Sequence, residues 1–349
     1  MIAQPSTQPA GKILIRLLAG LLLVVLLGVF AVVVVTSYLW RDAPAVADGG
    51  AAMVIIKRGS GLREVARQLE QAQVISDAKG FELLARRRGV AGKIQAGEYA
   101  VSYGRPMREV LEQLVQGRRV MRAFLVVPGT TAAEVAADLA ATGLDPNGLA
   151  AKLIRDPQFC ASLDVPAPSL EGFLYPETYS YERGDDAKTM LQRMVRQFFL
   201  VWNERFAEPA KKSQLSPLQI VTLASIIEKE TAYAPERPQI ARVFFNRLNK
   251  KMRLQADPTV IYALGEKYTG NLTAGHLRTD HPYNTYVYTG LPPGPICNPQ
   301  SSALAAVLSP AQGDWLYFVA DGAGAHVFSA TLAEHNRAVR QYRRKVRNP

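Results

Sequence analysis

The sequence predicts an α+β protein in three parts: a single N-terminal transmembrane helix, a small α+β module and a larger α+β domain. Three observations lead to this prediction. They are a long apolar run near the N-terminus, a strand–glycine–helix pattern that recurs after it, and an apolar helix that ends on two acids. With 349 residues the chain is long enough for two or three domains. Its 48% hydrophobic and 20% charged residues exclude a disordered chain.

The apolar run covers residues 13–40, and its uncharged part is long enough to cross a bilayer. A cleaved signal peptide would carry a shorter apolar region of about 7–15 residues before its cleavage site. We therefore predict an uncleaved transmembrane helix over residues 13–40. Lys12 and Arg16 lie at its N-terminal end, and the positive-inside bias places residues 1–12 in the cytoplasm. The rest of the chain then lies outside, which in a bacterium means the periplasmic side of the inner membrane.

The net charge of +11 suits nucleic acid, anionic lipid headgroups or an acidic polymer as a partner. The sequence contains no zinc-finger or RNP-type motif, so we do not expect a nucleic-acid partner. Its four histidines lack the spacing of a zinc-binding helix. Two cysteines, Cys160 and Cys297, are too few for a disulfide framework or a metal cluster. We expect two buried thiols, no metal and no cofactor.

A linker and a repeated pattern follow the apolar run. Residues 41–52 are small and contain Pro and Gly, which is typical of a linker. A strand-like run, a glycine and a helix-like stretch with Glu-Val and a later Leu then recur three times. We predict that the first two units form a module over residues 53–122, and that the third opens a domain over residues 123–349. The matching residues are Gly59, Glu64, Val65 and Leu69; Gly104, Glu109, Val110 and Leu114; and Gly129, Glu134, Val135 and Leu139.

The module over residues 53–122 is similar to LysM-like domains, which bind polymers of N-acetylglucosamine. A second interpretation stays open, in which the module only separates the next domain from the membrane. Farther along, residues 168–184 combine aromatic residues with Pro and Gly and predict an ordered loop with pieces of strand. Residues 186–206 show helical spacing, and their face of methionine and aromatic side chains predicts core packing.

The next predicted helix begins at Ser216 and is apolar on nearly every side. Ser216 suits the N-cap, and Pro217 suits the first position, where a backbone N–H would be unpaired in any case. Residues 218–227 place apolar side chains all round, which is typical of a buried helix. We expect Pro235 and Pro238 to end the helix, because proline cannot continue its hydrogen bonding.

Two acids, Glu228 and Glu230, lie near the C-terminal end of this helix. The helix dipole and burial both raise the pKa of a carboxyl there, as a general acid at neutral pH requires. A helical side chain lies over the residues three and four positions before it. For Glu230 these are Ile227 and Ile226, whereas Glu228 points about 200° away around the helix. Glu230 is therefore our candidate acid. The alternative is that both acids only pair with basic neighbours.

A resemblance to a known family begins in this helix. Residues 223–265 read LASIIEKETAYAPERPQIARVFFNRLNKKMRLQADPTVIYALG and resemble the YceG-like family of endolytic murein transglycosylases. Three further segments match the same family in order: EGFLYPETY at 171–179, YNTYVYTGLPPGPICNP at 283–299, and YFVADGAGAHVFSATLAEHN at 317–336. The resemblance covers about residues 53–340, and the predicted anchor precedes it as in the family.

The resemblance implies an activity. Such enzymes cut the glycan strands of nascent peptidoglycan internally, between N-acetylmuramic acid and N-acetylglucosamine, and so terminate or trim strand elongation. One glutamic acid protonates the bridging oxygen. The muramyl C6 hydroxyl, and not water, closes on C1 and leaves a 1,6-anhydro end, and the glutamate takes the proton of that hydroxyl. The resemblance also implies penicillin-binding synthases as partners.

The resemblance extends to individual residues. EKETAYAP is similar to the Glu-Ser-x-Phe-x-Pro stretch of lysozyme-like transglycosylases, which places the catalytic glutamate at Glu230 and the hydroxyl of Thr231 beside it. Gln255 takes the part of a sugar-facing glutamine in those relatives. Three more side chains offer amide or aromatic groups suited to sugars: Tyr262, Asn284 and Tyr286. For Gln255 and these three the plain alternative is a turn or a core contact. For Thr231 it is a hydroxyl that bonds back to the preceding turn.

Two other features have structural interpretations, and one rival function remains. We expect Asp257, which precedes Pro258, to form a turn or cap a helix. The loop over residues 290–299 is rich in proline and is predicted to form a wall of the saccharide groove. The rival is a membrane-anchored scaffold protein that binds peptidoglycan without cleaving it.

Overall fold

The computed structural model describes residues 10–39 and 49–347 of the chain, which divides into two compact units, Met1–Arg122 and Ala123–Pro349. Most of the predicted cytoplasmic segment and most of the predicted linker lie outside the described residues.

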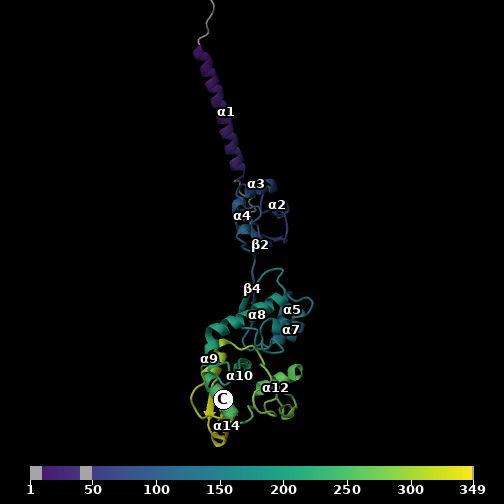
Figure 1. Cartoon of the computed structure of the whole chain (residues 1–349), viewed down its shortest axis with the longest axis vertical. Helices are drawn as coiled ribbons and strands as arrows, with labels where there is room; N and C mark the ends of the chain where they lie inside the picture. Colours follow the sequence, from purple (N-terminus) through teal and green to yellow (C-terminus); the bar gives the residue numbers. More distant parts are fainter. Residues whose placement is uncertain (1–9, 40–48, 348–349) are drawn as a thin grey trace, which may run out of the picture. The chain divides into compact units, whose positions relative to one another are not determined.

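Helix α1, Ala10–Leu39, is a single long helix (Figure 1). It carries the apolar stretch Ile15–Val35, whose side chains are exposed. By length and composition this stretch could cross a membrane, and no other helix in the described part of the chain is long and apolar enough to do so. The predicted apolar helix near the N-terminus is therefore present, while Trp40, its last predicted residue, lies outside the described residues.

The first unit also contains a small module with a core of its own. Strands β1 and β2 pair antiparallel, with Met53 opposite Ala100, and every second residue of β1 from Val54 onward is buried. Buried side chains of the helices, including Phe81 and Leu114, complete this core. The elements are β1 (Ala51–Ile56), α2 (Leu62–Gln71), α3 (Ala78–Arg87), β2 (Gly97–Ser102) and α4 (Met107–Val115).

The three predicted strand–glycine–helix units are all present. Each glycine has a positive φ, between 75° and 84°, which favours glycine because it has no Cβ. Each helix buries its Val and its later Leu, so the repeated sequence pattern corresponds to the same local packing in all three units. The turns are Gly59 between β1 and α2, Gly104 between β2 and α4, and Gly129 between β3 (Arg122–Leu125) and α5 (Ala132–Ala141).

The second unit begins with a two-stranded sheet and a group of helices. Strand β3 (Arg122–Leu125) pairs with β4 (Thr178–Tyr181), so residues 168–184 form the predicted loop with a piece of strand. Helix α5 (Ala132–Ala141) starts with a capping box formed by Thr131 and Glu134. The helices that follow are α6 (Leu149–Leu153), α7 (Pro157–Ser162), α8 (Ala187–Val201) and α9 (Ala207–Lys211), with a π-helical segment at Trp202–Phe206.

Helix α8 carries the methionine and aromatic face that the sequence predicted. Met190, Met194 and Val195 are buried, and the ring of Phe198 lies 5.9 Å from the ring of Trp202 in a stacked arrangement. These side chains belong to the large core of the second unit, which confirms a packing role for the face.

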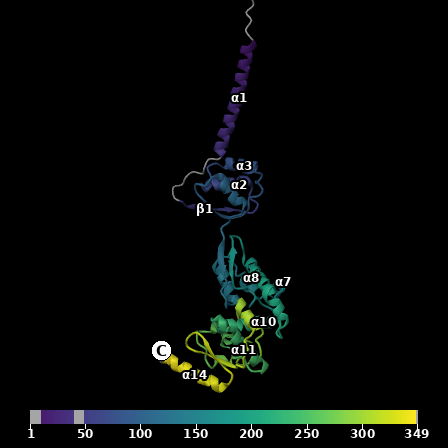
Figure 2. The ribbon, with the colours of Figure 1, turned by 90° about the vertical axis from the view of Figure 1, so that its left-hand side faces the viewer.

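The remaining elements build the part of the unit that contains the predicted helix. In both views α10 lies between α8 and α14 (Figures 1 and 2). Strands β5 and β6 form an antiparallel hairpin, which contacts α14. The elements are α10 (Pro217–Glu230), α11 (Arg237–Asn249), α12 (Asp257–Leu264), α13 (Ser301–Leu308), β5 (Tyr317–Ala320), β6 (His326–Ser329) and α14 (Leu332–Arg347).

Helix α10 ends earlier than the prolines predicted. Its last residue is Glu230, and Thr231 already has an extended conformation with φ −145° and ψ 133°. The Thr231 hydroxyl accepts a hydrogen bond from the N–H of Tyr233, which stabilises the turn out of the helix. Pro238 lies in the first turn of α11, where proline is tolerated. The expectation that Pro235 and Pro238 end this helix was wrong.

Candidate active site

The site is built around α10, whose sequence explains its position in the core. The Ser216 hydroxyl and the side chain of Gln219 form a reciprocal capping box, and Pro217 occupies the first helical position. All residues from 220 to 227 are buried, and the helix contacts α11, α12 and α13. Helix α10 is thus held on all sides, and its C-terminal residue, Glu230, has a defined position.

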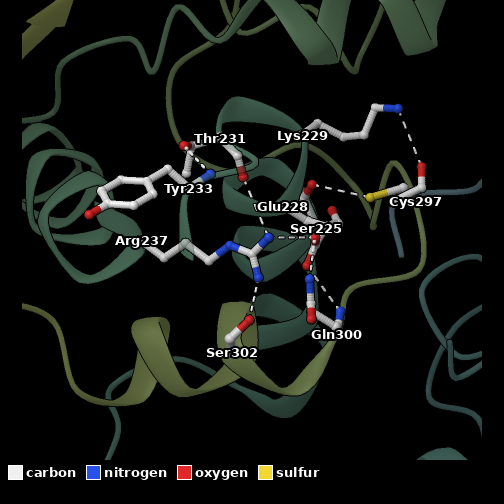
Figure 3. Close-up of polar contacts among 10 residues, drawn as sticks. Ser225, Glu228, Lys229, Thr231, Tyr233, Arg237, Cys297, Gln300 and Ser302 are labelled. Carbon is white, nitrogen blue, oxygen red and sulfur yellow. Dashed lines mark hydrogen bonds and ion pairs between the residues drawn. The ribbon is translucent and has the colours of Figure 1, made fainter. Parts of the chain in front are cut away.

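Helix α10 directs its two glutamates to different surroundings. The side chain of Glu228 is only 4% exposed and pairs with Arg237, whose Nη2 lies 2.7 Å from its Oε1. The backbone N–H and the side-chain amide of Gln300 also donate to this carboxylate, at 3.1 and 3.0 Å (Figure 3). Arg237 in turn donates to the hydroxyl of Ser302 and to the backbone carbonyl of Thr231. Glu228 therefore belongs to a buried, hydrogen-bonded ion pair.

Glu230 instead lines a cavity with a volume of about 350 Å³. Its walls come from the end of α10, the stretch that runs from α11 through the following loop to the start of α12, residues near 286, and β5 with α14. The lining residues are Glu230, Arg247, Leu254, Gln255, Asp257, Tyr286, Tyr317, Phe318, Leu332 and His335. Polar and aromatic side chains thus surround the acid, as a sugar-binding site would require.

The pKa of Glu230 is raised from its ordinary value of 4.5 to about 8, mainly by burial and in part by the negative charge of Asp257. The positive charge of Arg247 acts in the opposite direction. The residue as a whole is half-buried and lines the cavity. Within the described part of the chain, no group donates a hydrogen bond to this carboxyl. A carboxylic acid that keeps its proton at neutral pH can serve as a general acid.

Arg247 is fixed in the cavity wall. Its Nε donates to the carbonyl of Leu316 at 2.7 Å, and its Nη1 donates to the carbonyl of Leu254 at 2.5 Å. The guanidinium also lies 5.5 Å from the centroid of the Tyr317 ring, within reach of a cation–π interaction. These contacts connect α11 to the loop that follows it and to the segment that enters β5, so Arg247 holds the cavity walls together.

Gln255 has an unusual backbone conformation beside the acid. Its φ is +48°, a region that residues other than glycine rarely adopt, and its N–H donates to the carbonyl of Thr285 at 3.1 Å. The neighbouring N–H of Ala256 donates to the Thr285 hydroxyl at 3.0 Å. The strained turn is therefore held by the segment that carries Tyr286, and it places Gln255 in the cavity wall.

Two of the predicted sugar-binding residues, Gln255 and Tyr286, lie in the cavity with Glu230. The other three do not line it. The Thr231 hydroxyl is used in the turn after α10, and the Tyr262 hydroxyl donates to the carboxyl of Glu171 at 3.1 Å.

The side chain of Asn284, the third residue outside the lining, donates to the carbonyls of Leu277 and Thr279 at 3.2 and 2.8 Å. The loop over residues 290–299, predicted to form a groove wall, does not line this cavity either. Its Ile296 N–H donates to the Ser225 hydroxyl on α10 at 3.0 Å.

Sequence reasoning missed three polar residues of the cavity wall: Arg247, Tyr317 and His335. No local sequence motif marks them. Asp257 was expected to form a turn or a cap. The expectation of a cap was wrong: Ala256 is the N-cap of α12 and Asp257 is its first residue, and the Asp257 carboxylate accepts a hydrogen bond from the Tyr286 hydroxyl at 2.5 Å.

A second acid in the unit, Glu171, has a pKa raised to about 7 by burial. It accepts hydrogen bonds from the N–H of Ala132 and from Tyr262, and it does not line the cavity. Among the described residues no group of three His, Cys, Asp or Glu side chains is arranged to hold a metal ion.

Comparison with known proteins agrees with the sequence resemblance. A model of the YceG-like family matches residues 54–341. The chain belongs to the YceG-like family. A Bacillus subtilis relative named endolytic murein transglycosylase is 35% identical over 82% of this chain and 83% of its own length. A Streptococcus pneumoniae relative of the same name is 27% identical, and the match spans 57% of that longer protein. The crystal structure of a yceG-like protein from Listeria monocytogenes is 33% identical, with a TM-score of 0.55 over 83% of this chain and 99% of that chain.

Proposed function

We propose that this YceG-like protein is an endolytic murein transglycosylase that cleaves the glycan strands of nascent peptidoglycan from within. The observation that supports this proposal most directly is one acid, Glu230, which faces a polar cavity and has a pKa raised to about 8. Family membership and the names of the relatives support the same activity. The enzyme is a lytic transglycosylase and is expected to need no cofactor.

The proposed reaction uses Glu230 twice. Its carboxyl donates a proton to the oxygen that joins C1 of N-acetylmuramic acid to the next N-acetylglucosamine, and the C1–oxygen bond breaks. The C6 hydroxyl oxygen of the same muramyl residue then bonds to C1, and its proton returns to the carboxylate of Glu230. The products are a strand with a 1,6-anhydro end and a strand with a free N-acetylglucosamine hydroxyl. No water enters the reaction.

Other cavity residues would bind the sugar. We propose that the amide of Gln255 bonds to sugar hydroxyls and that the ring of Tyr286 lies against a sugar face. A sugar contact also stays a prediction for Thr231, Tyr262 and Asn284. Their polar groups have hydrogen-bond partners within the protein.

Products distinguish the reaction classes. Purified protein is incubated with uncrosslinked glycan strands, and the new ends are analysed by mass spectrometry. Wild type should produce 1,6-anhydro ends from within strands, and Glu230→Gln should produce none while its melting curve remains cooperative. Reducing ends in place of anhydro ends would identify a hydrolase. Absence of any cleavage by folded wild type would favour the non-catalytic scaffold.

We also propose a domain arrangement. Residues 13–40 anchor the chain in the bacterial inner membrane, residues 53–122 form a LysM-like module, and residues 123–349 form the catalytic domain on the periplasmic side. The order β1–α2–α3–β2 and the separate core support the module assignment. Lys12 and Arg16 support a cytoplasmic N-terminus.

Each part of the arrangement can be tested. Alkaline phosphatase fused after residue 349 should be active, because that enzyme folds only outside the cytoplasm. Residues 49–122 expressed alone should bind chitin oligosaccharides if the module is LysM-like, and binding below detection would leave it the role of a spacer. Penicillin-binding synthases are the proposed protein partners, and their co-purification with the full-length chain is the test.

A further inference from the structure

The cavity contains a second carboxyl group that the proposed reaction does not yet use. Asp257 begins α12 and lines the same cavity as Glu230. Its Oδ1 accepts a hydrogen bond from the Tyr286 hydroxyl at 2.5 Å, which fixes its position at the cavity wall. The two carboxyl groups come from the end of one helix and the start of another, so tertiary structure alone brings them together.

The surroundings divide the two acids into different roles. Glu230 accepts no hydrogen bond within the described part of the chain, and burial favours its neutral form. Asp257 is more exposed and accepts a short hydrogen bond from a phenol. Where two carboxyl groups in one site have different environments, one can serve as the acid and the other can stabilise charge.

Cleavage of a glycosidic bond creates the charge that Asp257 can stabilise. As the C1–oxygen bond breaks, positive charge develops on C1 and on the ring oxygen of the muramyl residue. A carboxylate placed in advance beside that charge lowers the barrier, because it needs no reorganisation during the reaction.

No basic side chain in the described lining is hydrogen-bonded to Asp257. The only guanidinium there, that of Arg247, donates to two backbone carbonyls instead. His335 has a pKa lowered by burial, so it adds no positive charge at neutral pH.

Building on the proposed function, we propose that Asp257, positioned by Tyr286, is a second catalytic residue that stabilises the oxocarbenium-like transition state. It forms no covalent bond to the sugar and accepts no proton. The C6 hydroxyl oxygen forms the new bond to C1, and Glu230 gives and recovers the proton. Asp257 contributes only its negative charge. This charge stabilises the sugar most strongly at the transition state, where the C1–oxygen bond is largely broken.

The decisive variant is Asp257→Asn, which keeps the size of the side chain and an oxygen that can accept the Tyr286 hydroxyl. We expect kcat to fall about 100-fold, the magnitude found when a preorganised electrostatic group is removed. KM should change by less than about threefold, and the products should keep their anhydro ends.

The pH profile supplies a readout that a purely structural role would not change. The titratable and charged groups that face Glu230 are Asp257, Arg247, Tyr286, Tyr317 and His335. Loss of the Asp257 charge removes a contribution that raises the pKa of Glu230. The alkaline limb of the kcat/KM profile should therefore move toward lower pH in Asp257→Asn by about half a pH unit or more.

The chain offers a matched control. Asp280 accepts a hydrogen bond from the Tyr288 hydroxyl at 2.5 Å, the same contact as in the Asp257–Tyr286 pair, and both aspartates are exposed, but Asp280 lies outside the cavity lining. Asp280→Asn should leave kcat and the pH profile unchanged. Should Asp257→Asn fail to fold, Tyr286→Phe replaces it: this variant removes the hydrogen bond but keeps the charge, so kcat should fall about tenfold with the alkaline limb in place.

Two different failures can be told apart. Wild-type protein that makes no new strand ends overturns the proposed function, and this role of Asp257 with it. An active wild type together with Asp257→Asn that keeps full kcat and an unmoved alkaline limb overturns the role of Asp257 alone. If Asp257→Asn folds poorly, Tyr286→Phe with wild-type kcat overturns the proposal as stated, because the proposal requires the Tyr286 hydrogen bond to hold the carboxylate in place.

Discussion

The proton on Glu230 sets the pH range in which the enzyme can work. With a pKa of about 8, roughly nine tenths of this carboxyl is protonated at pH 7 and roughly one tenth at pH 9. An ordinary glutamate with a pKa of 4.5 would be about 0.3% protonated at pH 7. Burial at the end of α10 thus increases the amount of active acid at neutral pH about 300-fold.

The assay is the pH dependence of kcat/KM, which reports the free enzyme. With soluble uncrosslinked strands as substrate, we expect a plateau to about pH 7 and a roughly tenfold decrease between pH 7 and pH 9. Glu230→Gln should lose at least about a thousandfold of activity at every pH, because it cannot donate a proton. A profile that already declines near pH 4.5, or one that stays flat to pH 10, would refute the role of a buried acid. Melting curves of wild type at each pH serve as the control.

Three further predictions concern stability. Glu230 holds its proton more tightly in the folded chain than in the unfolded chain, so the free energy of unfolding decreases as pH rises from about 4.5 to about 8. Glu230→Gln should therefore have a higher Tm than wild type at pH 8, by about 2–4 °C for each kcal/mol of difference in the free energy of unfolding. This difference in Tm should vanish near pH 4. Glu228→Ala, only two residues away, should instead lose about 3 kcal/mol in urea unfolding, because it leaves Arg237 buried without its partner; a loss below about 1 kcal/mol would contradict a buried ion pair. Tyr262→Phe should lose about 1 kcal/mol of stability with the Glu171 hydrogen bond, while kcat/KM stays within about twofold; a tenfold lower kcat/KM would place its hydroxyl on the sugar.

Local sequence patterns were enough for much of the fold. The three strand–glycine–helix units could be read because each glycine and each Val–Leu pair acts within a dozen residues of its own position. The start of α10 followed from Ser216 and Pro217 for the same reason. The end of that helix could not be read from the prolines, since the turn at Thr231 depends on a local hydrogen bond that no residue type specifies.

What the sequence by itself determined about the site is the separation of two glutamates. Glu228 and Glu230 lie on different sides of one helix, and the geometry of a helix requires that before any tertiary contact forms. Only the tertiary structure decided which side is the cavity and what else lines it. Arg247, Asp257 and Tyr286 lie on different elements from Glu230, and each has an ordinary local role in its own segment. They become a site because folding places α11, α12 and the segment near residue 286 around the end of α10, and long-range packing of this kind leaves no periodic trace in the chain.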